Sequence, residues 1–184
     1  MKSTATKYGT VAVTLHWLSA LFIFALMGSG FRAGSLVEST AKASVLSAHV
    51  PLGIIILLLT LARVAWWLFA DRKPNHPAGD PGWQIMSAKI VHVLFYIVIF
   101  GMVASGIGMM VLSGAGTILF AGSAEPLPDF WDYLPRVPHG IGARVMILLL
   151  VLHIGAALYH HFIRKDGLIW RIWFGQKNQQ ERPK

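Results

Sequence analysis

Histidine is the residue type in this chain whose placement could do chemistry. Six of the eight histidines fall in or at the ends of long apolar runs: His16, His49, His92, His139, His153 and His160. A titratable ring taken out of water costs several kcal/mol unless it has a partner. Two facing neutral imidazoles can saturate a haem iron for electron transfer, leaving no open position for oxygen. The histidines therefore predict metal ligation in pairs, although any single one could be a hydrogen-bonded packing residue.

The absence of cysteine narrows this chemistry. A chain without cysteine has no disulfide, no thiolate metal site and no C-x-x-C-H attachment of a c-type haem. Any haem must therefore be held by coordination alone.

Four apolar runs must position the histidines. The 184 residues are 55% apolar and only 13% charged, far from the composition of soluble chains. Each run can cross a bilayer core of about 30 Å, which needs about 20 helical residues. Since the backbone must satisfy itself in hydrocarbon, each should be a helix, at residues 11–31, 49–69, 90–113 and 140–163. The sequence predicts one domain, residues 1–184, folded as an all-α integral membrane four-helix bundle.

The first run is expected to be a retained helix. Its apolar part of about 20 residues exceeds the 7 to 15 or so of a secretory signal, and no convincing A-x-A site follows it.

Lysine and arginine in the flanks predict the orientation. With a cytoplasmic N-terminus, only Arg32, Lys42 and Arg136 flank the outer side, whereas the inner side collects Lys2, Lys7, Arg72, Lys73, Lys89, Arg164, Lys165, Arg171, Lys177, Arg182 and Lys184. Both termini should therefore be cytoplasmic. The net charge of +8 reflects this topology and contact with anionic lipid heads, and we expect no nucleic-acid binding.

Helix geometry suggests how the histidines pair. His139 and His153 are 14 residues apart, which returns to within about 40° of the same helix face, about 21 Å further along. His49 opens the second run level with His139, at the outer edge. Depth leaves the inner pair open, because His16 matches His153 as well as His92 matches His160.

On these residues the chain resembles the bacterial cytochrome b561 family, related to the cytochrome b subunits of nickel-iron hydrogenases and formate dehydrogenases. The resemblance covers nearly the whole chain. It is carried by the HW pair at His16 and Trp17, by His49 before a glycine-containing helix, by Arg63, by KIVHVLFYIVI around His92 and, most specifically, by LHIGAALYHHFIRKDG from Leu152 to Gly167.

The resemblance implies a bundle enclosing two b-type haems in the bacterial inner membrane. The fourth helix would supply one ligand to each haem, which implies His49 with His139 for the outer haem and His16 with His153 for the inner one. His92 and His160 would then lie beside a quinone site, where a histidine can pass the proton that quinone reduction consumes. Arg63 should pair with an inner propionate or a quinone oxygen, and Arg144 with an outer-haem propionate.

The expected function is single-electron transfer from an outer donor to ubiquinone. One characterised line of the family oxidises superoxide and reduces ubiquinone, and this chain is most similar to it in length and motif order. The expected activity is therefore that of a superoxide:quinone oxidoreductase. Superoxide is an anion, but the outer face balances Arg32, Lys42, Arg136 and Arg144 against Glu38, Glu125, Asp129 and Asp132, so charge counting predicts no strong funnel.

Two other interpretations remain. The chain could be a partner subunit that accepts electrons from a docked dehydrogenase or a periplasmic redox protein, with the acidic, aromatic loop Ser123–Arg136 as its docking surface. It could also be a non-redox membrane protein whose histidines relay protons or pack.

Overall fold

The structure is a computed structural model that describes residues 2–76, 79–121, 123 and 125–174. Lys177, Arg182 and Lys184, which the sequence assigns to the inner flank, lie outside these residues.

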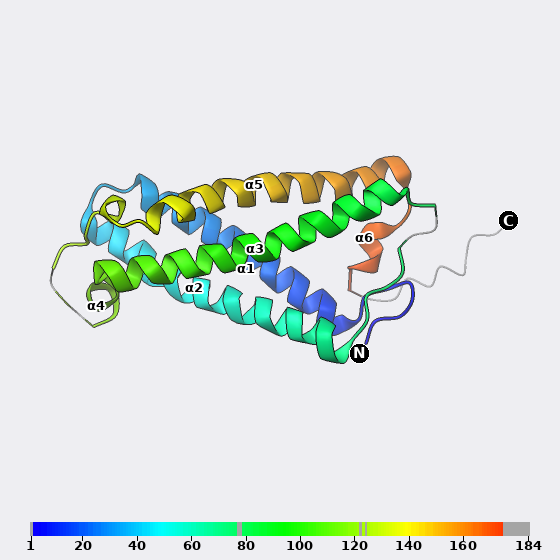
Figure 1. Cartoon of the computed structure of the whole chain (residues 1–184), viewed down its shortest axis with the longest axis horizontal. Helices are drawn as coiled ribbons and strands as arrows, with labels where there is room; N and C mark the ends of the chain where they lie inside the picture. The colour runs from blue at the N-terminus through cyan, green and yellow to red at the C-terminus, as the bar shows by residue number, and fades with distance from the viewer. Residues whose placement is uncertain (1, 77–78, 122, 124, 175–184) are drawn as a thin grey trace.

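Four long helices run along the long axis of the molecule (Figure 1). They are α1 (Thr10–Ser35), α2 (Ser39–Ala65), α3 (Gly82–Ser113) and α5 (Arg136–Tyr159). No strand occurs in the part of the chain that the structure describes. The prediction of an all-α membrane bundle is confirmed.

Short elements close the two ends of the bundle. We call the end with the N-terminal segment, the α2–α3 loop and α6 (Leu168–Arg171) the inner end, where α2 and α5 finish in the π-helical turns η1 (Trp66–Ala70) and η3 (His160–Arg164). The outer end carries α4 (Ala115–Phe120) and η2 (Phe130–Asp132).

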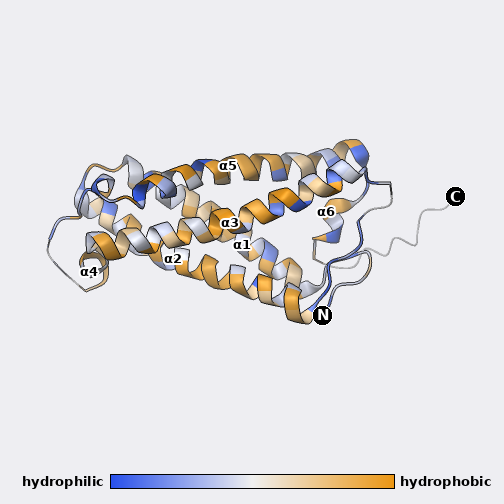
Figure 2. Cartoon of the chain, viewed as in Figure 1, coloured by the Kyte–Doolittle hydropathy of each residue, from blue (hydrophilic) through white to orange (hydrophobic). Residues whose placement is uncertain are grey.

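The long helices expose most of their apolar side chains. Hydrophobic residues cover the helix shafts and polar residues gather toward the ends (Figure 2). Only 6–22% of the most apolar window of each helix is buried inside the protein. Such surfaces need lipid as their solvent, so this is a membrane protein with four spans.

The second helix starts ten residues before its apolar run, at Ser39 rather than at 49. It passes through Pro51, which removes the backbone N–H that would bond the Ser47 carbonyl. This proline inside the helix is tolerated, because membrane helices accept such interruptions where other groups satisfy the backbone.

The helices pack as two couples. Close approaches are concentrated between α1 and α2 and between α3 and α5, whereas α5 approaches α1 and α2 much less closely. The couples meet around a small buried cluster formed by Ile56, Ile99, Met146 and Leu150. The backbone of α5 therefore stands away from the two helices whose histidines face it.

We expect the contact of α5 with α3 to tolerate no side chain at Gly142. A Cβ there would lie 2.5 Å from Met102 Sδ, so Gly142→Val should lower the thermal midpoint of the detergent-purified protein. Overpacking of about 1–3 kcal/mol corresponds to roughly 2–10 °C in a chain of this size.

The matched control is Gly101→Val on the exposed face of α3, where an added Cβ meets nothing within 4 Å. Combining Gly142→Val with Met102→Ala should recover most of the loss. An unchanged midpoint in Gly142→Val would show that this contact is not close-packed.

Candidate functional site

The histidines of α5 face histidines of the other couple at two depths. The rings of His16 on α1 and His153 have their centroids 6.2 Å apart, and the rings of His49 on α2 and His139 have theirs 6.3 Å apart. The 14 residues from His139 to His153 separate the pairs by about 21 Å along α5. The bundle thus holds two separate imidazole pairs, one toward each end.

Hydrogen bonds determine which nitrogen each outer imidazole offers. The Ser29 hydroxyl donates to Ala25 O at 2.7 Å, so it accepts from His49 Nδ1, 2.9 Å away. On the other side, His139 Nδ1 lies 3.0 Å from Met102 O, which can only accept. Both rings therefore carry the proton on Nδ1 and keep Nε2 as a lone-pair ligand.

A second hydroxyl supports the same assignment for His139. Ser105 Oγ lies 3.0 Å from His139 Nδ1 and donates its own proton to Gly101 O at 2.8 Å. Ser105 is 8% exposed, so its position is fixed by packing as well as by these bonds.

Glycines leave room beside the outer rings. A Cβ at Gly30 would lie 3.2 Å from His49 Cε1, and one at Gly106 would lie 3.5 Å from His139 Cε1. Close approach of the backbone to the imidazole needs glycine at position 30, because a side chain there would have to displace the ring.

The inner pair has a cation beside it. Arg63 Nη2 lies 3.4 Å from His16 Nδ1, and Arg63 Nε is buried without a hydrogen-bond partner among the described residues. A cation within a membrane helix costs about 2.5–3.5 kcal/mol or more at the bilayer centre unless an anion offsets it. The free edge of this guanidinium fits an acidic group such as a haem propionate.

A third histidine joins the inner pair. The ring of His92 on α3 lies 5.4 Å from that of His153, centroid to centroid, and Phe95 lies 5.5 Å from it. His153 therefore has two imidazole neighbours, His16 and His92.

The spacing of the facing rings fits axial ligation of one iron. A metal–nitrogen bond of about 2 Å and about 1.1 Å from nitrogen to ring centre put two such imidazoles roughly 6.2 Å apart. The His16–His153 and His49–His139 separations agree with this value, and the His92–His153 separation is shorter. The imidazole donor set, the free Nε2 atoms of the outer pair and the open edge of Arg63 fit a b-type haem.

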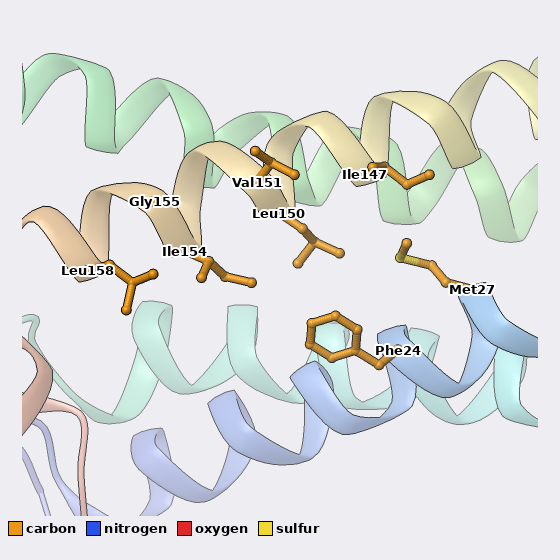
Figure 3. A pocket seen from close by; sticks show the side chains of 8 residues that line it. All are labelled: Phe24, Met27, Ile147, Leu150, Val151, Ile154, Gly155 and Leu158. Carbon is orange, nitrogen blue, oxygen red and sulfur yellow. The ribbon is translucent and has the colours of Figure 1, made fainter.

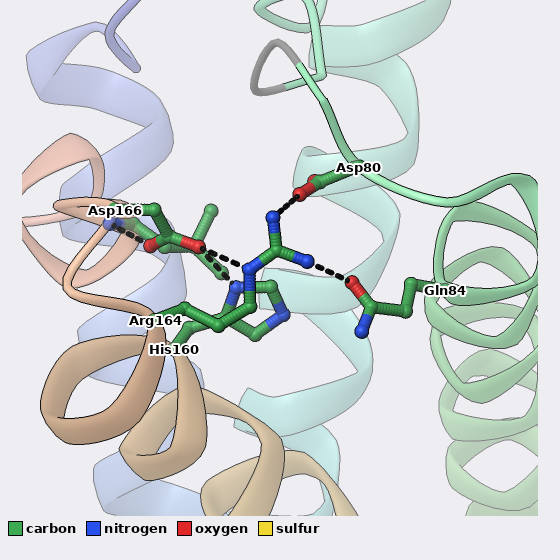
Figure 4. A network of polar contacts seen from close by, with 6 residues as sticks. Asp80, Gln84, His160, Arg164 and Asp166 are labelled. Atoms are coloured by element: carbon green, nitrogen blue, oxygen red, sulfur yellow. Dashed lines mark hydrogen bonds and ion pairs between the residues drawn. The ribbon is translucent and has the colours of Figure 1, made fainter.

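His160 lies elsewhere, at the start of η3. Its Nδ1 is hydrogen bonded to Asp166, within a polar network that also includes Arg164, Asp80 and Gln84 (Figure 4). His160 is thus joined to the inner surface of the protein and not to another histidine.

Arg144 lies one turn beyond His139 at the outer end. Its Nη1 donates to Gly140 O at 2.9 Å. Arg136 Nη1 lies beside the same glycine, 3.0 Å from the position that a Cβ on Gly140 would take. The Arg136 guanidinium also lies 4.4 Å from the ring centroid of Trp131. Neither arginine forms an ion pair within the described ranges, so both can act on an anion near His139.

An apolar groove of about 420 Å³ opens between α1 and α5 (Figure 3). It is lined by Phe24, Met27, Ile147, Leu150, Val151, Ile154, Gly155 and Leu158. None of these side chains can donate a hydrogen bond, so the groove cannot exchange protons with a bound molecule.

A strap of residues 3–9 covers the inner end. Ser3 donates its backbone N–H and its hydroxyl to Asp71, the latter at 2.7 Å, and Arg171 Nε donates to Thr6 O at 2.7 Å. Burial alone would raise the pKa of Asp71, but the hydrogen bonds from Ser3 outweigh it and hold that pKa below its usual range.

Several of these residues could not be selected from the sequence. Ser29 and Ser105 are common residue types in membrane helices, and only their position opposite a histidine gives them a role. Asp166 lies within the recognised Leu152–Gly167 segment, but its contact with His160 depends on a chain reversal.

Four apolar helices that hold paired imidazoles at the spacing of a shared iron define a membrane-embedded b-type cytochrome. The sequence model of the family described as "Prokaryotic cytochrome b561" matches residues 7–175, and the chain belongs to that family. It is therefore a membrane electron-transfer protein, and the resemblance read from the sequence is confirmed.

Individual relatives are distant but match over nearly their full length. "Cytochrome b561 homolog 1" of Escherichia coli (strain K12) is 23% identical over 172 residues, covering 90% of this chain and 96% of its own. "Probable superoxide oxidase CybB" of Yersinia pestis is 24% identical over 170 residues, covering 90% and 95%. "Cytochrome b562" of Cereibacter sphaeroides is 24% identical over 171 residues, covering 90% and 94%.

Attachment of the strap should depend on pH through Asp71. The pKa of Asp71 is lower in the folded protein than in the unfolded chain. The ionised carboxylate therefore stabilises the folded protein fully at a pH above the unfolded pKa, and this stabilisation is lost as the pH falls through the folded pKa. Asp71→Asn should lower the thermal midpoint at pH 7 by on the order of 5 °C.

The gap between Asp71→Asn and the unmodified protein should close as the buffer is acidified toward the pKa of Asp71. Glu38→Gln at the outer end serves as the control and should show no such gap. A gap that stays constant from neutral to acid pH would contradict this role of the carboxylate.

Proposed function

We propose that this chain is a di-haem b cytochrome that passes electrons from a donor at the outer end to ubiquinone at the inner end. The observation that carries the proposal is the presence of two imidazole pairs, at 6.2 and 6.3 Å, held by one helix about 21 Å apart. In a core of about 30 Å, this places one pair near each membrane face.

The proposed ligands are His49 with His139 for the outer haem and His16 with His153 for the inner haem. The 5.4 Å between His92 and His153 is less than two ligands of one iron need, which favours His16 as the partner of His153. The other inner pair that depth along the helices left open, His92 with His160, is tested by the substitutions described below.

A haem held this way supplies reversible one-electron chemistry at iron. The protein's part is to orient the ligands and to balance charge. Ser29, Ser105 and Met102 O keep Nδ1 protonated, so that Nε2 stays available to iron. Arg63 is proposed to neutralise an inner propionate or a quinone oxygen, and Arg144 an outer propionate.

Superoxide is the donor that we propose at the outer end. The relative from Yersinia pestis named as a probable superoxide oxidase supports this choice. Arg136 and Arg144, which converge on Gly140 beside His139, would attract an anion locally even though the outer face is balanced overall.

Ubiquinone is the acceptor that we propose at the inner end. Its reduction consumes protons, and only this end combines Arg63 with two histidines, His92 and His160, that are not needed as ligands. His160 Nδ1 is hydrogen bonded to Asp166, whose carboxylate can stabilise a protonated imidazole, and we therefore propose His160 as the proton donor of the two. The basic inner end is proposed to face the cytoplasm of a bacterium, with the chain in its inner membrane.

One observation supports a second candidate function. Trp131 is 66% and Leu134 83% exposed in the outer loop, which would suit docking of a dehydrogenase or periplasmic redox protein to a cytochrome subunit. Reduction of quinone by the isolated chain with superoxide alone would exclude this alternative.

The ligand assignment predicts specific haem losses. The purified chain should hold two haems, measured as the haem-to-protein ratio by pyridine haemochromogen. His153→Ala and His139→Ala should each reduce the ratio to about one, because each removes a ligand of a single iron.

The inner pair is tested with His16→Ala and His92→Ala. The first should lose one haem and the second should keep both. If His92→Ala loses a haem while His16→Ala keeps two, the inner pairing is wrong.

His160→Ala should keep both haems and slow quinone reduction. Loss of a general acid typically costs about 100-fold or more. The rate of quinone reduction after a pulse of superoxide measures this step. His161→Ala is the matched control, because the His161 ring contacts Phe162 and Trp170 instead of Asp166. Equal slowing in both variants would remove His160 from the proposed proton path.

A further inference from the structure

The contact of His160 with Asp166 is built by a reversal of the chain. On a continuous helix, residues six apart point about 120° away from one another and lie about 9 Å apart along the axis. Here the π-helical turn η3 ends at Arg164, the next residue, Lys165, has φ +52°, and Gly167 follows with φ +76°. A lysine in the left-handed region costs about 1–2 kcal/mol, so the contacts that the reversal makes must offset this strain.

Asp166 uses both carboxylate oxygens in this reversal. Oδ2 accepts the hydrogen bond from His160 Nδ1, and Oδ1 accepts one from Leu168 N–H at 3.0 Å. The side chains of His160 and Asp166 are 12% and 14% exposed, so water screens the pair little. Burial would raise the pKa of Asp166, but the hydrogen bonds from His160 and Leu168 lower it, and the carboxylate stays ionised.

Arg164 connects the His160–Asp166 pair to the loop before α3 and to the first turn of that helix (Figure 4). Its Nη2 lies 3.2 Å from Asp80 Oδ1, its Nη1 donates to Gln84 Oε1 at 2.9 Å, and its Nε lies 3.8 Å from Asp166 Oδ2. The Asp80 side chain is only 7% exposed. Because the guanidinium already lies between the two carboxylates, the cluster is an ion-pair network and not a cation site.

Without His160, the cluster of Asp80, Asp166 and Arg164 carries a net negative charge. The charged groups that face the His160–Asp166 pair are Arg164 on η3 and Asp80 on the loop, and the Tyr159 ring lies edge-on to His160 at 5.8 Å. Two carboxylates against one guanidinium leave a net charge of −1. An imidazolium at His160 completes the balance.

We propose that Asp166 is a positioning residue for proton transfer: it fixes the proton of His160 on Nδ1 and stabilises the imidazolium, so that Nε2 always exchanges the proton with the substrate. This rests on the proposed quinone reduction at the inner end. A quinone takes two electrons, which two superoxide ions would supply under the proposed function, and two protons. For each proton supplied here, the His160 Nε2–H bond breaks and a quinone O–H bond forms. Neutral His160 keeps Nδ1–H on Asp166 and regains a proton at Nε2 from water at the inner surface.

Asp166→Asn separates this role from a structural one. The asparagine Oδ1 can still accept the Leu168 N–H bond that shapes the turn, but an amide neither compels the Nδ1–H tautomer nor balances an imidazolium. We expect kcat for quinone reduction to fall about 10–100-fold, as for other orienting partners of functional histidines. KM and the haem-to-protein ratio should change little, and the alkaline limb of the pH–rate profile should move to lower pH.

Asp132→Asn, at the outer end, is the control and should match the unmodified protein in all four measurements. If Asp166→Asn reduces quinone at the unmodified rate with an unchanged pH profile, while His160→Ala is slow, Asp166 is not a positioning residue.

A spectroscopic measurement decides the same point without turnover. In protein labelled with ¹⁵N-histidine and held at alkaline pH, where the ring is neutral, the His160 signal, identified by its absence in His160→Gln, should report an Nδ1–H tautomer that Asp166→Asn loses. An unchanged tautomer in Asp166→Asn overturns the inference. If the unmodified protein fails to reduce quinone, the proposed function is wrong, whereas this spectrum still tests the role of Asp166.

Discussion

The fixed gap between facing imidazoles is the constraint on which the rest of this bundle depends. Two rings separated by about 6.2 Å can share an iron, whereas rings in direct contact or further apart cannot. The helices pack as α1 with α2 and α3 with α5, so the histidine-bearing face of α5 lies away from α1 and α2. The small protein core and the lipid-exposed apolar shafts follow from this arrangement, because the bundle is not closed by side-chain packing alone.

The serine and threonine hydroxyls that are buried among the described residues each have a partner on their own helix. Ser19, Thr60 and Ser105 each donate to the carbonyl one turn earlier on their own helix. Ser29 and Ser105 use the remaining lone pair of the hydroxyl for a histidine Nδ1. A hydroxyl that donates to its own helix can only accept from a histidine, and it therefore fixes the tautomer of that histidine without placing a charge in the membrane.

The sequence predicted the membrane helices and the face that carries the histidines, because these depend on hydrophobicity and on helical periodicity. It did not predict the contacts that form where the chain reverses direction. Helical spacing along the fourth apolar run brought His139 and His153 to one face, and hydropathy located all four spans. It could not find the start of α2 at Ser39, because residues 39–48 are mostly small or polar and do not belong to the apolar run. The contacts of Asp166 with His160 and of Arg164 with Asp80 join residues through a π-helical turn and across a loop, which no period encodes.

The two ends of the bundle differ in the charge of the groups that contact their histidines. At the outer pair, neutral hydroxyl and carbonyl groups contact the histidines, and the two arginines lie at the surface. At the inner pair, Arg63 lies beside His16 with its Nε buried and unpaired among the described residues, and His160 is hydrogen bonded to a carboxylate of an ion-pair network. A site that exchanges only electrons needs no group that can give up a proton, whereas one that reduces a quinone does. The asymmetry therefore supports electron entry at the outer end and proton-coupled chemistry at the inner end.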